Sequence, residues 1–159
     1  MRELSMGNEP KVFRAGRLRH TFDALVERLA KYGCVTSDVW VLTTRGRTSG
    51  LLRSTPINLL ENEQGRFLVA PYGEVGWVRN IRKDGFATLR QGGWLELVSV
   101  VEVGPDRAAP VLKEYLQHPR VAVVGPYFQA APDSPVEWFR DEAHRHPVFE
   151  IVRSTTVRI

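Results

Sequence analysis

The sequence predicts an α+β fold built around an antiparallel β-barrel. Six short segments rich in β-branched, aromatic or alternating apolar residues are separated by turns that contain glycine, proline or asparagine. Many short strands at such spacing favour a barrel or sandwich over a parallel sheet. Helical periodicity occurs at the ends of these strands, so we expect the helices to lie at the periphery.

The N-terminal part predicts an arm followed by a helix. Residues 1–16 are polar and mixed, and we expect a loose arm before a single domain over residues 17–159. Between Leu18 and Tyr32 the apolar residues recur with helical spacing, and Gly33 follows as a plausible helix end. The other face of this helix (18–32) is basic. It either covers one side of the domain or contacts a membrane surface peripherally.

The remaining elements follow in alternation. The predicted strands are residues 38–44, 51–60, 66–70, 86–90, 94–103 and 148–152. Helical turns are predicted over residues 74–83. A helix is predicted over 105–118, where Pro119 ends it, and another helix is predicted to begin at the segment 132–135.

Composition indicates an ordinary globular protein and excludes several classes. The chain has 159 residues, 43% of them hydrophobic, with a net charge of +4 and a pI of about 9.6. No block of five or six like charges occurs, which argues against a nucleic-acid-binding tail. Cys34 is the single cysteine, so no disulfide framework is expected. Without an apolar signal core or an 18-residue apolar run, the expected location is cytoplasmic.

The stretch from Trp40 to Leu60 carries the clearest functional pattern. Two strand-like segments flank a turn with three arginines, four hydroxyl side chains and two glycines. Backbone N–H groups in a glycine-containing turn can form a concavity for anions, and arginine forms bidentate bonds with phosphate. We therefore expect a phosphate-binding turn, although a basic hairpin turn can also serve solubility alone.

A second cluster, Ala70 to Asn80, combines glycines with aromatic side chains. Its glycines allow backbone to approach a flat ligand, and Asn80 can donate and accept hydrogen bonds. Trp77 could pack beside such a ligand or instead anchor a short helix to the barrel. Together with the basic turn, this cluster suits a flavin-like cofactor.

Other chemistries have little support in the sequence. The four histidines lack metal-ligand spacing, and a surface or capping role is expected for His144 and His146. No nucleophile motif is present. The carboxylate pairs at Glu61 and Glu63 and at Asp141 and Glu142 are interpreted as solvated.

The segments LTTRGRTSGLLRSTP (42–56) and FLVAPYGEVGWVRNIR (67–82) resemble the deazaflavin (F420)-dependent nitroreductase family of split-β-barrel flavin/deazaflavin oxidoreductases. The resemblance implies a split β-barrel of mostly antiparallel strands with peripheral helices. It also implies hydride transfer from reduced F420 to a small organic acceptor, such as an activated alkene, quinone or nitro compound.

The resemblance implies a set of site residues by position. By this resemblance, the phosphate and acidic tail of the cofactor would be bound by Arg47, Thr48, Ser49, Gly50 and Arg53. The deazaflavin ring would be bordered by Pro56, Asn58, Ala70, Tyr72, Gly73, Trp77 and Asn80. Tyr127 would be a proton donor or part of the substrate pocket, and Phe128 would line that pocket. No metal is implied. Members often carry a lysine where this chain has Thr48, so one positive charge of the grip is missing.

Three alternatives remain open at this stage. The same barrel could bind FMN instead of F420. The protein could also be a non-catalytic cofactor carrier, or could bind lipid surfaces through the basic helix. A homodimer is a further possibility, since a barrel edge can be exposed.

Overall fold

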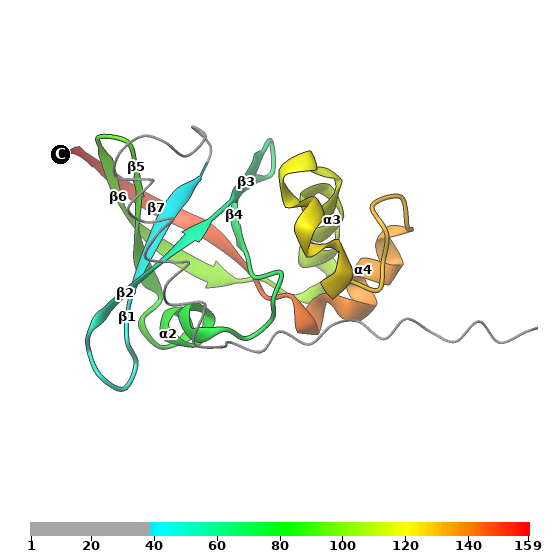
Figure 1. Ribbon diagram of the computed structural model, residues 1–159, viewed down its shortest axis with the longest axis horizontal. Helices are drawn as coiled ribbons and strands as arrows, with labels where there is room; N and C mark the ends of the chain where they lie inside the picture. The colour runs from blue at the N-terminus through cyan, green and yellow to red at the C-terminus, as the bar shows by residue number, and fades with distance from the viewer. Residues whose placement is uncertain (1–38) are drawn as a thin grey trace, which may run out of the picture.

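The computed structural model describes residues 39–159 (Figure 1). The predictions for the arm 1–16 and the helix 18–32 lie outside the described residues. Seven antiparallel strands form one sheet in the order β2-β1-β5-β6-β7-β4-β3, which confirms the predicted α+β antiparallel architecture. The strands are β1 (Trp40–Arg45), β2 (Leu52–Ile57), β3 (Leu59–Asn62), β4 (Gly65–Val69), β5 (Phe86–Gln91), β6 (Trp94–Glu102) and β7 (Val148–Arg158).

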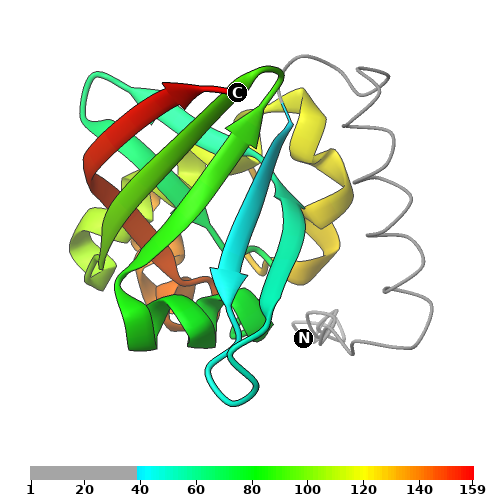
Figure 2. The same cartoon turned by 90° about the vertical axis from the view of Figure 1, so that its left-hand side faces the viewer.

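The two edges of the sheet come from one continuous stretch of chain. β2 and β3 occupy opposite edges but are separated in sequence by Asn58 alone. The sheet therefore has to curl until its edges approach each other, as Figure 2 shows. The single strand predicted over 51–60 was wrong in this respect, because the chain bends at Asn58 to pair first with β1 and then with β4.

The last strand is longer than predicted. β7 extends through Arg158 and pairs along the whole of β6, from Trp94 opposite Arg158 to Glu102 opposite Phe149. Its second half, from Arg153 onward, is exposed and polar. Such a segment lacks the apolar alternation that marks a strand in the sequence, and its structure depends on pairing with β6.

Helix α2 (Gly76–Asp84) matches the predicted helical turns. Val78 and Ile81 are buried against the inside of the barrel. The helix ends at Gly85, whose φ of 73° and N–H bond to Ile81 O (2.7 Å) require the conformational freedom of glycine. This helix lies next to the β1–β2 turn (Figures 1 and 2).

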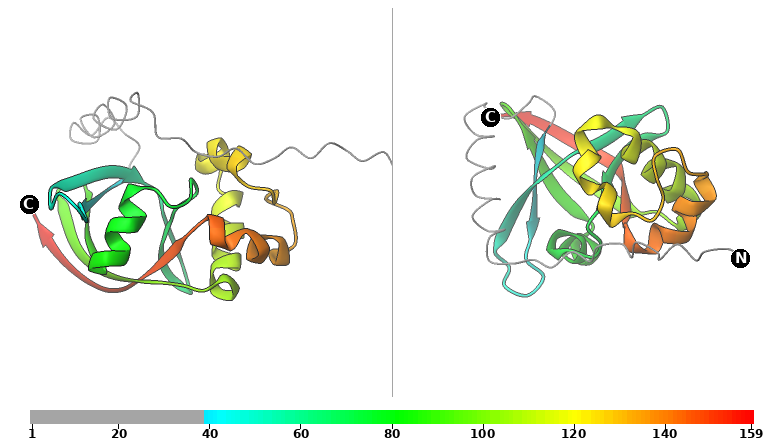
Figure 3. Two further views of the ribbon diagram at one scale, coloured as in Figure 1. Left: turned by 90° about the horizontal axis from the view of Figure 1, so that it is seen from below. Right: turned by 45° about the vertical axis from the view of Figure 1, so that its right-hand side comes forward.

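The remaining helices lie together on one side of the sheet, away from α2 (Figure 3). They are α3 (Pro105–Gln117), the 3-10 helix η1 (Pro119–Tyr127), α4 (Val136–Glu142) and the 3-10 turn η2 (Ala143–Arg145). α3 begins with proline and ends before Pro119, as predicted. The sequence analysis did not predict η1.

Two hydrophobic cores meet at β4. Leu68 faces the barrel interior with Leu42 and Val98, whereas its neighbours Phe67 and Val69 face the core beneath α3 and α4. This alternation follows from the two-residue repeat of a strand. β4 thereby joins the barrel to the helical side and leads directly into the segment 70–75.

Candidate active site

The β1–β2 turn is closed by its own backbone and projects beyond the sheet (Figure 2). Gly46 N donates to Leu51 O (2.8 Å), and Gly50 N donates to Gly46 O (2.8 Å). A Cβ on Gly46 would lie 2.7 Å from Ser49 Oγ, and Gly50 has a φ of 69°. The left-handed backbone of Gly50 therefore requires glycine, and a side chain at Gly46 would crowd Ser49.

Asn80 connects this turn to α2. Its Oδ1 accepts hydrogen bonds from the Arg47 backbone N–H (3.1 Å) and from Arg47 Nη1 (3.4 Å). Its Nδ2 donates to Thr44 Oγ1 (3.0 Å), and the residue is 4% exposed. A buried amide with both ends bonded fixes the turn relative to the helix.

Further positive charge surrounds this connection. Lys83 Nζ donates to the Arg47 carbonyl (2.8 Å) from the same helix. Arg53 pairs opposite Thr44 across β1 and β2, so both lie on one face of the hairpin. Within residues 39–159 no carboxylate lies within ion-pair distance of Arg47 or Arg53, whereas Arg45 lies 3.9 Å from Asp84. Arg47, Arg53, Thr48 and Ser49 are all exposed.

The segment Ala70–Gly73 is held against the chain that precedes β7. Ala70 N donates to Pro147 O (2.9 Å), and Gly73 N donates to Ala70 O (3.2 Å). Gly73 has a φ of 89°, and a Cβ there would lie 3.3 Å from Arg145 O. This arrangement gives the segment a compact turn in which glycine is required.

Aromatic side chains lie on both sides of this segment. The half-buried Tyr72 ring meets the Tyr127 ring edge to face, with centroids 4.9 Å apart. Trp77 packs toward the barrel core, 5.8 Å from the Phe149 ring centroid, which agrees with the anchoring alternative. Phe128 is buried and stacks on the His146 ring, with the ring centroids 3.8 Å apart. Tyr127 therefore contacts Tyr72, whereas its neighbour Phe128 contacts His146.

Pro56 lies in β2, and Asn58 lies between β2 and β3. Pro56 is half-buried opposite Val41. Asn58 forms a hydrogen bond with Tyr115 of α3, and burial raises the pKa of the Tyr115 hydroxyl despite this bond. Asn58 and Tyr115 border a small pocket with a volume of about 20 Å³, which is lined by Asn58, Leu59, Leu60, Tyr115, His118 and Val121. Arg53 lies near the start of β2, and Asn58 follows its last residue.

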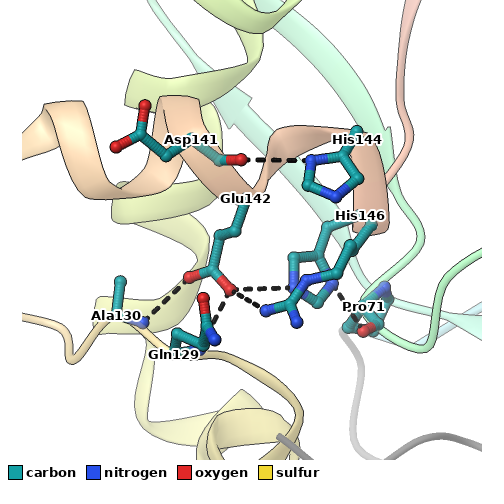
Figure 4. A network of polar contacts seen from close by, with 8 residues as sticks. Pro71, Gln129, Ala130, Asp141, Glu142, His144 and His146 are labelled. Atoms are coloured by element: carbon teal, nitrogen blue, oxygen red, sulfur yellow. Dashed lines mark hydrogen bonds and ion pairs between the residues drawn. The ribbon is translucent and has the colours of Figure 1, made fainter.

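The structure corrects the predictions for Glu142 and His146. Instead of being solvated, Glu142 is 2% exposed, and His146 is 3% exposed instead of lying at the surface. The Glu142 carboxylate accepts hydrogen bonds from the N–H groups of Gln129 (2.9 Å) and Ala130 (2.9 Å) and from Arg145 Nη2 (2.8 Å) (Figure 4). Burial alone would raise the pKa of Glu142, but these bonds and His146 outweigh burial and hold its pKa at about 2.

Sequence reasoning also missed Lys83, although a signal was present. Lys83 follows Asn80 by three residues, which puts both on one face of α2. The buried carboxylate had no such signal, because its surroundings come from segments distant in sequence. Among residues 39–159 no group of three or more His, Cys, Asp or Glu side chains could hold a metal ion. None of the helices within this range is long and apolar enough to span a bilayer.

Comparison with known proteins identifies relatives of the fold. A NimC/NimA family protein from Clostridium acetobutylicum is similar with a TM-score of 0.51 and 12% identity, over 89% of this chain and 94% of that one. Atu2129, a protein of unknown function from Agrobacterium tumefaciens, is similar with a TM-score of 0.50 and 15% identity, over 76% of this chain. The match spans about half of Atu2129, 51% of its length. A third structure, a domain-swapped dimer, has a TM-score of 0.50 and 18% identity, over 84% of this chain and 96% of that one.

These structures share the split-barrel fold, and a family comparison extends the relationship to function. None of the curated proteins compared with this chain matches it. The model of the F420H(2)-dependent quinone reductase family matches residues 18–133, which is most of the chain. The chain therefore belongs to the F420H(2)-dependent quinone reductase family, and is an oxidoreductase that transfers hydride from reduced F420 to an acceptor.

Proposed function

We propose that the β1–β2 turn binds the phosphate and acidic tail of F420, and that Ala70–Gly73 borders its deazaflavin ring. We name Ala70–Gly73 the cofactor wall and Tyr127–Ala130 the acceptor wall. A small-molecule acceptor of the quinone class, or an activated alkene or nitro compound, would lie beside the acceptor wall. The observation that carries this proposal is the Asn80 bridge, which fixes Arg47 next to Thr44 and Lys83.

The donor set of the turn suits an anionic cofactor. Arg47, Arg53 and Lys83 supply three cations around one short segment, and Arg47 meets the neutral Asn80. Guanidinium groups bind phosphate and carboxylate oxygens through paired N–H bonds. Lys83 also partly replaces the charge that Thr48 lacks.

When bound, reduced F420 supplies the hydride. The protein residues then have four roles. Arg47 and Arg53 hold the anionic groups, and Asn80 keeps the turn in register with α2. The cofactor wall orients the ring, and Tyr72 with Tyr127 excludes water from the acceptor side. Correct placement of two reactants accounts for much of the rate in such a transfer, so no obligatory acid or base is needed.

The first test is a fluorescence titration of the protein with F420, with FMN as the comparison ligand. Arg47→Ala and Arg53→Ala should each weaken F420 binding by about 10- to 100-fold, because each removes a charge-assisted contact of about 1.5–3 kcal/mol. Arg153→Ala is a matched control, since Arg153 is exposed on β7, three strands from β1. Equal binding by all three variants would refute the proposed grip. Tighter binding of FMN than of F420 would refute the assignment of F420 as the cofactor without affecting the assignment of the fold.

The proton that accompanies hydride transfer would come from Tyr127 or from solvent. If Tyr127 donates it, Tyr127→Phe lowers kcat by about 100-fold while leaving F420 binding unchanged. The measurement is steady-state oxidation of reduced F420 with a quinone such as menadione. Full turnover by this variant would exclude Tyr127 as the donor.

A further inference from the structure

We infer that Glu142 and His146 are positioning residues that hold the cofactor wall and the acceptor wall at a fixed separation. This inference rests on the proposed function, because both walls are assigned there. Neither residue was part of the predicted site, and neither touches the proposed positions of cofactor or acceptor.

His146 holds the cofactor wall. Its Nδ1 lies 2.8 Å from Pro71 O, the carbonyl of the second residue of that wall. A carbonyl can only accept, so Nδ1 carries a proton and donates it to this bond. The neighbouring bond from Ala70 N to Pro147 O (2.9 Å) holds the wall from the same side.

Glu142 holds the acceptor wall. Its two carboxylate oxygens accept the consecutive N–H groups of Gln129 and Ala130. The residues just before them are Tyr127 and Phe128, and Phe128 stacks on the His146 ring with an interplanar angle of 11°. The acceptor wall is thus fixed by one carboxylate and one ring stack.

The two residues form a single connection. His146 Nε2 lies 3.4 Å from Glu142 Oε2, so the path from Pro71 to Ala130 runs through two adjacent side chains (Figure 4). Both are at most 3% exposed, and no side-chain polar atom buried in the described part of the chain lacks a partner. A buried network with every group bonded resists displacement of any one member. A shift of either wall would therefore break bonds on the other.

Two substitutions of His146 separate its two bonds. In His146→Asn the amide nitrogen takes the place of Nδ1 and keeps the bond to Pro71. In His146→Gln the amide nitrogen reaches the place of Nε2 and keeps the contact with Glu142 but loses Pro71. Both variants lose the ring stack on Phe128, so their difference reports the Pro71 bond.

Two measurements use these variants. The first is hydrogen–deuterium exchange of residues 70–75 in the protein without cofactor, where His146→Gln should exchange faster than His146→Asn. The second is F420 affinity, where His146→Gln should bind about tenfold more weakly than His146→Asn, as expected for loss of one hydrogen bond worth about 1.4 kcal/mol. Glu142→Gln should raise both the Kd for F420 and the KM for menadione, because Glu142 bonds the acceptor wall directly and contacts His146, which bonds the cofactor wall.

A control separates positioning from general destabilisation. Glu96 is also a buried carboxylate, bonded by Arg66 (2.8 Å) and Ser154 (2.9 Å) inside the barrel. Glu96→Gln should lower the free energy of unfolding as Glu142→Gln does, yet leave F420 affinity and menadione KM unchanged. Equal exchange and equal affinity in the two His146 variants would overturn the inference while wild-type F420 binding still supports the proposed function. Failure of the wild type to bind F420 would instead overturn the proposed function.

Discussion

The basic turn and the Glu142 network are both built from charged groups, yet they differ in nearly every physical respect. The turn keeps Arg47 and Arg53 exposed and without a carboxylate partner among residues 39–159. The network buries Glu142 with four hydrogen-bonding partners. Exposed charges contribute little to folding but can attract an anion from solution. A buried charge with complete bonding contributes to folding and fixes geometry.

Within the proposed site, this difference assigns cofactor affinity to the turn and the fixed geometry to the network. Changes at the turn should alter cofactor binding with little effect on stability, and changes at the network should alter stability first. Asn80 is the exception, because it is buried and also bonded to the turn. The following predictions test whether this separation holds, beginning with the largest expected effect.

Glu142→Ala should lower the free energy of unfolding by about 3–5 kcal/mol, because Arg145 and two backbone N–H groups lose a buried acceptor. Arg53→Ala should change it by less than about 0.5 kcal/mol, as expected for an exposed side chain. Urea denaturation of both variants measures this contrast. Similar losses in the two would show that the turn contributes to folding as much as the network does.

The second prediction concerns acid stability. The pKa of Glu142 is about 2 in the folded protein, below its ordinary value of 4.5. A lowered carboxylate pKa stabilises the fold fully above the ordinary value, and this stabilisation disappears as the pH falls toward about 2. We expect up to about 3 kcal/mol of stability to disappear over this range.

Urea unfolding between pH 5 and pH 2.5, with steps of about half a unit, measures this change. Glu142→Gln should show a flatter dependence, with the remaining slope coming from other carboxylates such as Glu74, whose pKa is lowered by Arg82. Parallel curves for wild type and variant would contradict the assignment.

Asn80→Ala should have smaller effects on both properties. It leaves the Arg47 N–H and the Thr44 hydroxyl without their partner, which should lower the free energy of unfolding by about 1–3 kcal/mol. It should also weaken F420 binding, because the turn loses its link to α2. Lys83→Ala is the matched comparison, since Lys83 is exposed and should affect binding alone. An effect of Asn80→Ala on stability without any effect on binding would show that the link from Asn80 to the turn does not contribute to cofactor binding.

The sequence predicted most of the local structure because local signals produced it. The glycines of the β1–β2 turn, the apolar positions of α2 and the prolines around α3 are each readable within about ten residues. The part of β7 beyond Val152 could not be predicted, because its exposed polar residues form a strand only by pairing with β6. The bend at Asn58 was equally hidden, because it depends on two partner strands.

The candidate site divides along the same line. Arg47, Arg53 and Asn80 could be selected from the sequence because arginine-rich turns and lone amides near glycine stand out. Glu142 looked like half of an exposed carboxylate pair on a helix. Its carboxylate is bonded by Gln129 and Ala130, and its neighbour His146 is bonded to Pro71, 75 residues earlier in the sequence. No local pattern could have revealed that environment.

The position of β7 in the sheet has a consequence for how the chain is made. β7 lies between β6 and β4 in the sheet but follows the other strands of residues 39–159 in the sequence. Until it emerges from the ribosome, β6 and β4 each present an unpaired edge, and the β3–β4 hairpin has no strand partner in the rest of the sheet. Unpaired edges invite pairing with another chain. The nascent protein is therefore expected to need protection from association until residues 148–158 are available.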